Sequence, residues 1–135
     1  MAIQLSTTVR NARLDAITTA IGVSAKLIIY TGAAPANCAA AATGTALATL
    51  TLPAAWMSDA SSGSKSMTGT WSDLSADETG TAGYFRIYDN SEISCGIQGT
   101  ITATGGAGDM TIDNTSIVQG QSVEITSFVL TDGNA

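Results

Sequence analysis

From residue 25 onward the chain consists of short apolar runs, each ended by a cluster of Gly, Asn, Asp or Ser. Such runs between turn residues are typical of short β-strands. The pattern predicts a mainly β protein, an antiparallel β-sandwich or barrel of about eight short strands. The expected strand segments are KLIIYTG (26–32), ALATLTL (46–52), SMTGTWSDL (66–74), GYFRIYD (83–89), SCGIQGTITA (94–103) and MTIDNTSIVQGQSVEITSFVLTDG (110–133), the last of which DNTS and QGQ break into shorter strands.

The N-terminal segment follows a different pattern. Along STTVRNARLDAITTAIG, apolar residues recur close to helical spacing. Ser6 or Thr7 can cap the start of a helix, and Gly22 can end it in a left-handed conformation. The pattern predicts one N-terminal amphipathic helix over residues 7–21. By contrast, the Ser- and Gly-rich stretch at 54–66 is expected to be a loop.

The length of 135 residues suits one domain, because no linker-like stretch divides the chain. A chain of this size can bury a core without depending on a disulfide. We therefore expect a single domain over 1–135, with an N-terminal arm and helix at 1–22 and a β domain at 23–135.

Acidic residues outnumber basic ones, and the formal net charge is −6. The five basic residues form no cluster, which argues against nucleic acid or an anionic membrane as a partner. No apolar stretch reaches the roughly 18–20 residues of a membrane-spanning helix, and the N-terminus lacks the pattern of a secretion signal. We expect a protein made in a cytoplasm, with no nucleic acid and no membrane as a partner.

The chain contains no histidine, which excludes Ser-His-Asp and Cys-His catalytic arrangements. The carboxylates have neither the spacing of a calcium loop nor a pair set apart as in a glycosidase. They are expected to cap turns and to keep the protein soluble. We therefore expect a protein that is not an enzyme and has no catalytic residue, no cofactor and no metal site.

The two cysteines follow similar sequences. Cys38 comes eight residues after Tyr30 in IIYTGAAPANC, and Cys95 comes seven residues after Tyr88 in RIYDNSEISC. This echo indicates two similar strands of one sheet, each followed by a turn. Without a secretion signal we expect reduced thiols that pack as small apolar groups. A disulfide stays open as an alternative, because it depends on a distance between Cα atoms that sequence does not show.

The strand GYFRIYD has two faces, because side chains alternate along a strand. Phe85 and Ile87 share one face and are expected to fill the core. Tyr84, Arg86 and Tyr88 share the other face, which we expect to be half exposed. Tyrosine and arginine are frequent at protein interfaces, so this second face is a candidate contact surface.

Several segments together resemble one group of proteins. They are LSTTVRNARLDAI, IYTGAAPANC, the segment around Trp56, GTW (69–71), TAGYFRIYD and ITSFVLTDG. Over nearly its whole length the chain resembles small structural proteins from the virions of tailed bacteriophages. The resemblance implies a structural protein located in the virion and assembled in the host cytoplasm.

Within that class, the expected function is capsid decoration (cement): binding the outer shell and stabilising it. The expected partners are the major capsid protein or another virion protein, and copies of the chain itself in a homo-oligomer. The alternatives are a tail or head–tail junction protein, and a carbohydrate-binding module for host attachment. The module would use Trp56, Trp71 or the tyrosines as a stacking platform, whereas buried tryptophans, which we expect, would anchor the core.

The expected contact residues lie in two places. They are Ile3, Leu5, Val9, Arg10 and Arg13 in the arm and helix, and Tyr84, Arg86 and Tyr88 on the strand. Replacing Arg10 and Arg13 with Glu is expected to weaken particle binding and to leave the fold intact.

Overall fold

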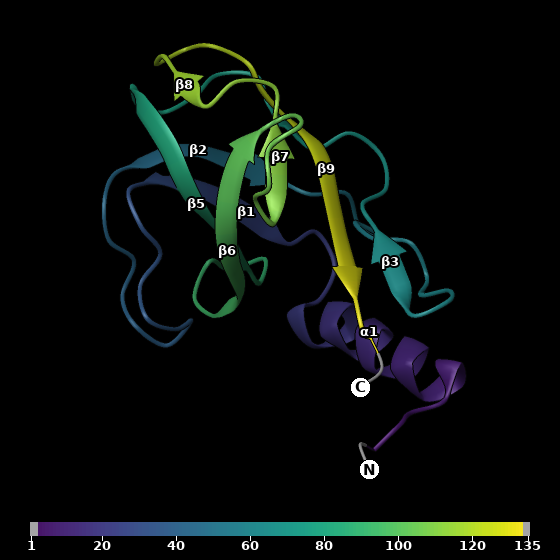
Figure 1. The fold of residues 1–135 in the computed structure, drawn as a ribbon. Helices are drawn as coiled ribbons and strands as arrows, with labels where there is room; N and C mark the ends of the chain where they lie inside the picture. The colour runs from purple at the N-terminus through teal and green to yellow at the C-terminus, as the bar shows by residue number, and fades with distance from the viewer. Residues whose placement is uncertain (1–2, 134–135) are drawn as a thin grey trace.

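The computed structural model describes residues 3–133 of the chain (Figure 1). In this part, one helix precedes nine strands, which form one sheet curled into a half-barrel. The elements are α1 (Thr7–Ile21), β1 (Lys26–Thr31), β2 (Ala46–Thr51), β3 (Ser64–Ser66), β4 (Ser72–Asp73), β5 (Gly80–Tyr88), β6 (Cys95–Ala103), β7 (Met110–Ile112), β8 (Ser116–Ile117) and β9 (Val123–Thr131). The predicted mainly β fold with one N-terminal helix is confirmed.

The strand order is β2-β1-β5-β6-β7-β9-β3, with β4 pairing with β9 and β8 pairing with β5. Strands β5 and β6 form the predicted hairpin, and β1 lies antiparallel to β5 on the other side. The short β7 runs parallel to β6, and the other strand pairs are antiparallel. The expectation of an antiparallel sheet therefore holds, with one parallel pair as the exception.

The open side of the half-barrel is bridged by the segment around β4. The Thr49 amide on β2 donates to Asp73 Oδ2 at 3.1 Å. The Asp77 amide donates to the carbonyl of Leu47 at 2.8 Å, also on β2. These bonds occupy polar groups at the outer edge of β2, where an uncovered strand would be free to pair with another chain. Asp73 therefore has a structural role that its sequence position did not reveal.

Aromatic side chains fill the interior. Trp56 and Trp71 are 2% and 0% exposed, which confirms that they anchor the core. Their ring centroids lie 6.0 Å apart, and Trp71 lies 5.8 Å from Phe128. Phe128 in turn meets Phe85 edge to face at 5.5 Å. A buried indole offers no stacking platform, so the proposed use of these tryptophans in sugar binding is wrong.

The predicted strand at 66–74 is wrong in its extent. The chain forms β3 and β4 at its two ends, and residues 67–71 between them belong to neither strand. Gly69 lies at a φ of +68°, a left-handed conformation that interrupts an extended strand. The preceding stretch at 54–66, expected to be a loop, includes the whole of β3.

The helix has the bounds predicted from its caps. The Ser6 side chain accepts a hydrogen bond from the Val9 amide at 3.2 Å, and Gly22 follows the last turn with a φ of 94°. Its packing differs from that of an amphipathic helix, however. Leu14 is the one side chain of α1 that is buried, and Val9 is 46% exposed. Apolar burial therefore accounts for only part of how this helix is held.

Candidate functional site

Polar contacts hold α1 across one end of the half-barrel, close to β3 and to both ends of the described chain (Figure 1). Asp15 Oδ1 accepts hydrogen bonds from the Ala60 amide at 2.9 Å and from Lys65 Nζ at 3.0 Å. The Lys65 ammonium also donates to Thr18 Oγ1 at 2.9 Å. Lys65 is buried, so its charge requires these partners. The contacts fix which face of the helix meets the sheet.

The pKa of Asp15 is lowered by the Ala60 amide and, after it, by the Lys65 ammonium. Because the folded pKa lies below the unfolded one, this carboxylate stabilises the fold above the unfolded pKa of about 3.9. The contribution is lost as the pH falls through the folded pKa. We expect Asp15→Asn to be less stable than the wild type at pH 7, with the difference shrinking below about pH 4.

Urea unfolding between pH 7 and pH 2.5 would measure this effect. Asp59→Asn, which changes an exposed carboxylate on the neighbouring loop, is the matched control and should follow the wild type throughout. A constant difference between Asp15→Asn and the wild type at every pH would show that the carboxylate charge does not stabilise the helix contact.

Two predicted contact residues, Arg10 and Arg13, also hold the helix to Asp132, the residue that follows β9. Arg10 Nη1 donates to the carbonyl of Asp132 at 3.0 Å, and Arg10 Nη2 donates to Thr7 Oγ1 at 3.1 Å. Arg13 forms an ion pair with Asp132 at 3.1 Å. Replacing both arginines with Glu would place three carboxylates together and break these contacts. That the double variant leaves the fold intact stays a prediction, and the loss of these contacts makes its unfolding stability the measurement that checks it.

The predicted contact face of β5 is buried. Tyr84, Arg86 and Tyr88 are 0%, 2% and 8% exposed, so the expectation of a half-exposed face is wrong. Residues 32–45, which we name the cover loop, fold over these side chains. The Tyr84 hydroxyl accepts a hydrogen bond from the Thr43 amide of this loop at 3.0 Å. A buried face presents no surface to a partner.

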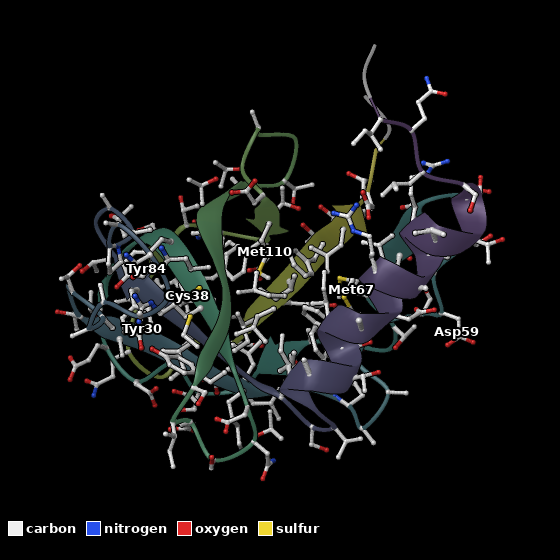
Figure 2. The ribbon with its side chains drawn as sticks, turned by 90° about the horizontal axis from the view of Figure 1, so that it is seen from below. Tyr30, Cys38, Asp59, Met67, Tyr84 and Met110 are labelled. Carbon is white, nitrogen blue, oxygen red and sulfur yellow. The ribbon has the colours of Figure 1, made fainter. Side chains whose placement is uncertain are left out.

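Tyrosines line the space beneath the cover loop. The Tyr30 and Tyr84 rings stack with centroids 4.9 Å apart. The Tyr30 and Tyr88 hydroxyls lie 3.0 Å apart, and burial, followed by this hydrogen bond, raises the pKa of Tyr30. Figure 2 labels Tyr30, Tyr84 and Cys38 in this part of the molecule. Gly83 permits the close approach of the loop, because a Cβ there would collide with the backbone of Gly32.

Arg86 ties the cover loop to the sheet. Its Nη2 donates to the carbonyls of Ala40 at 2.8 Å and Asn37 at 3.2 Å, and its Nε donates to Gln98 Oε1 at 3.1 Å. Burial acts to lower the pKa of Arg86, but the hydrogen bond with Tyr88 and the nearby thiol and phenol groups raise it overall. The guanidinium therefore stays charged inside the protein. Its role is structural, which sequence alternation could not distinguish from surface exposure.

The predicted contact residues of the N-terminal arm and helix are more exposed than Arg86 and the tyrosines. Ile3 is 84% exposed, Val9 is 46% exposed, and Leu5 is half-buried. Over the described residues, the exposed large apolar side chains are Ile3, Val9, Val23, Leu74, Ile93, Val118 and Val129. Ile3 and Val9 lie before and in the first turn of α1, and Val23 follows its last turn, so both ends of the helix keep apolar side chains in contact with solvent.

Two depressions share Ile17 in their lining, and each lies where α1 borders the sheet. One has a volume of about 440 Å³ and lies between the helix and the end of β9, where Ala16 and Thr131 line it. The other has a volume of about 380 Å³ and lies between the helix and the β5–β6 turn, where Ala20 and Gly96 line it. We name the two together the Ile17 groove. Sequence reasoning missed it, because the groove forms only where the helix meets two distant strands.

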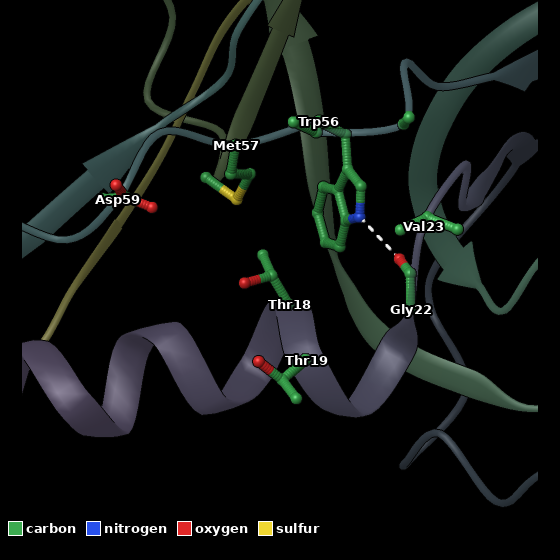
Figure 3. Close-up of a pocket in the computed structure, with 9 residues that line it drawn as sticks. Thr18, Thr19, Gly22, Val23, Trp56, Met57 and Asp59 are labelled. Carbon is green, nitrogen blue, oxygen red and sulfur yellow. Dashed lines mark hydrogen bonds between the residues drawn. The ribbon is translucent and has the colours of Figure 1, made fainter.

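A third depression, of about 410 Å³, lies between the C-terminal half of α1 and the segment at 54–59 (Figure 3). Trp56 lines it, with its Nε1 donating to the carbonyl of Gly22 at 2.9 Å. This bond satisfies the indole internally and joins the end of the helix to the core. Trp56 therefore stabilises the end of the helix, and its indole N–H is not free to bind a ligand in this depression.

Comparisons with protein-family models, with curated proteins and with solved structures found no match for this chain. Over residues 3–133, no group of three or more Cys, Asp or Glu side chains lies close enough together to hold a metal ion. No helix that the structure describes is long and apolar enough to cross a membrane. The candidate site is the surface of α1 with the Ile17 groove, where exposed apolar side chains and two depressions occur on one element.

Proposed function

We propose that this chain is a non-enzymatic structural protein of a bacteriophage virion, and more specifically a capsid decoration (cement) protein. The observation that supports the proposal best is the surface of α1, which combines the Ile17 groove with the exposed side chains of Ile3, Val9 and Val23 at the two ends of the helix. The sequence resemblance to small tailed-phage virion proteins supplies the class. The partner is the major capsid protein or another protein of the outer shell, with copies of the chain bound at repeated positions.

The surface of α1 around the Ile17 groove fits a docking role for physical reasons. Apolar surface that stays exposed on a well-packed domain often marks a protein contact. Ala16 and Ala20 are small, so the helix backbone can approach a partner closely. The polar contacts of Asp15 and Lys65 hold the helix in place before binding, which limits the entropy lost on association. The net charge of −6 favours a partner surface that is basic near the contact.

Charged side chains in the groove should abolish docking. We expect the double substitution Ala16→Arg, Ala20→Arg to reduce the occupancy of particles at least tenfold, because the long cationic side chains fill both depressions. Both alanines are exposed and arginine favours helices, so unfolding stability should change by less than about 1 kcal/mol. The measurement is sedimentation of labelled protein with purified particles that lack it.

Leu74→Arg is the matched control. Leu74 is 80% exposed and directly follows β4, and Ala76, two residues later, hydrogen-bonds with Gly120 and Gln121 shortly after β8. Figure 1 shows β8 at the opposite end of the molecule from α1. This variant should bind as the wild type does. If the groove variant also saturates the particles, or if both variants lose binding equally, the Ile17 groove is not the docking surface.

Copy number in purified virions tests the class of function itself. Quantitative mass spectrometry should give a ratio to the major capsid protein of one or a simple fraction of one, because decoration follows the symmetry of the shell. About a dozen copies per virion would assign the chain to the tail or its junction instead. Absence of the chain from virions would overturn the proposed function.

A further inference from the structure

The echo between the two Ile-Tyr segments corresponds to a pairing in space. The strands β1 and β5 bring the two echoed tyrosines together, with the Tyr30 and Tyr88 hydroxyls 3.0 Å apart. The cysteines that follow these tyrosines also meet. The Cys38 thiol neighbours that of Cys95, although the two belong to the cover loop and to the start of β6. Cys95 Sγ donates a hydrogen bond to the carbonyl of Ile97 at 3.4 Å.

Other contacts fix the positions of the loop and the strand that carry the two thiols. The carbonyl of Asn37, the residue before Cys38, lies 3.2 Å from the Arg86 guanidinium on β5. Cys95 stands opposite Tyr88 in the β5–β6 pairing and packs against the buried tyrosines. Both cysteines are free thiols and half-buried. A loop and a strand that are distant in sequence therefore converge on one pair of sulfur atoms.

We infer that Cys38 and Cys95 are a redox-sensitive thiol pair whose disulfide locks the cover loop onto the sheet. A peroxide is the oxidant. Cys38 Sγ attacks the O–O bond of hydrogen peroxide, which gives a sulfenic acid and one water molecule. Cys95 Sγ then attacks the Cys38 sulfur, the S–S bond forms, and the hydroxyl group leaves with the thiol proton as a second water molecule. The two sulfur atoms are oxidised and the peroxide is reduced.

The order of these steps follows from the surroundings of the two thiols. Burial and the neighbouring Cys38 thiol raise the pKa of Cys95 to about 12, so Cys95 is rarely a thiolate at neutral pH. Cys38 lies in the cover loop between the exposed residues Asn37 and Ala39, whereas Cys95 packs against the buried tyrosines. Cys38 is therefore assigned as the residue that meets the oxidant, and Cys95 as the residue that resolves the sulfenic acid. Because thiolate is the nucleophile in both steps, disulfide formation should become faster as the pH rises from 7 to 9.

The disulfide has a structural consequence. Side-chain hydrogen bonds, including those of Arg86 and Gln98, hold the cover loop to the sheet. A covalent bond at Cys38 would restrict the unfolded chain and keep this loop closed. The oxidised protein should therefore unfold at a temperature several degrees higher than the reduced protein.

The test uses the full chain and hydrogen peroxide in small excess, and it does not rest on the proposed function. We expect the intact mass to fall by the mass of two hydrogen atoms, with a Cys38–Cys95 peptide after digestion. The thermal midpoint should rise by several degrees, and dithiothreitol should reverse the rise. The Cys38→Ser and Cys95→Ser variants should each show no rise of the thermal midpoint under peroxide. If Cys95→Ser does not fold, Cys38→Ser still tests the inference.

Two results would overturn the inference. Retention of both free thiols under peroxide, or disulfides only between molecules, would show that the two sulfur atoms do not react with each other. A Cys38–Cys95 disulfide that leaves both the thermal midpoint and the protease sensitivity of the cover loop unchanged would show that the bond locks nothing.

Discussion

Replacing Trp71 with alanine is expected to lower the free energy of unfolding by about 4 kcal/mol. The indole is 0% exposed and lies between two other aromatic rings, with centroid distances of 6.0 Å to Trp56 and 5.8 Å to Phe128. Truncation removes these contacts and leaves a cavity that rigid strands cannot close. Urea denaturation followed by circular dichroism measures the change, because the substitution removes one of the two tryptophans that give the fluorescence signal.

Two further variants separate the loss of the aromatic ring from the loss of its hydrogen bond and from the effect of a surface substitution. Trp71→Phe keeps a ring but loses the hydrogen bond from Nε1 to the carbonyl of Thr68 at 3.1 Å, so it should be destabilised by only about 2 kcal/mol. Leu74→Ala changes a side chain that is 80% exposed and should lie within about 0.5 kcal/mol of the wild type. A Trp71→Ala protein as stable as Leu74→Ala would mean that the two aromatic neighbours do not form the centre of the core.

The parts of the fold that sequence predicted well are those with local causes. The bounds of α1 follow from Ser6, whose hydroxyl satisfies the Val9 amide, and from the backbone freedom of Gly22. The hairpin of β5 and β6 follows from strong alternation and from the turn residues between the strands. Pairing partners farther away were not predictable, because nothing local specifies that β9 lies between β7 and β3.

The candidate site was predicted less well, because burial depends on distant segments. Alternation showed that Tyr84, Arg86 and Tyr88 share a face, but it could not show that the cover loop lies on that face. One feature of the sequence could have indicated that this loop is packed against the sheet. The loop sequence GAAPANCAAAATGT is rich in alanine, whereas a solvated loop would be more polar. Likewise, Asp15 and Lys65 are distant in sequence, and only the fold brings them together.

Replacing Arg86 with methionine is expected to lower the free energy of unfolding by about 3 kcal/mol. Methionine fills similar space but donates no hydrogen bond. The carbonyls of Asn37 and Ala40 and the side chain of Gln98 then lose a charged donor, and each such bond contributes about 1.5–3 kcal/mol. Removing a buried charge offsets part of this loss. The loss of hydrogen bonds outweighs this offset, because the guanidinium donates to three acceptors.

Arg13→Met is the matched control, since the Arg13 side chain is 60% exposed and forms an ion pair at the surface. It should change stability by no more than about 1 kcal/mol. The two variants should also differ in where the protein opens. Arg86→Met should make the cover loop more sensitive to limited proteolysis under native conditions, because the loop loses two of its anchors while the core stays packed. If Arg86→Met unfolds with wild-type stability and its cover loop resists protease, the buried guanidinium does not hold the loop. The loop would then close over the tyrosines through apolar packing and the Tyr84 contact alone.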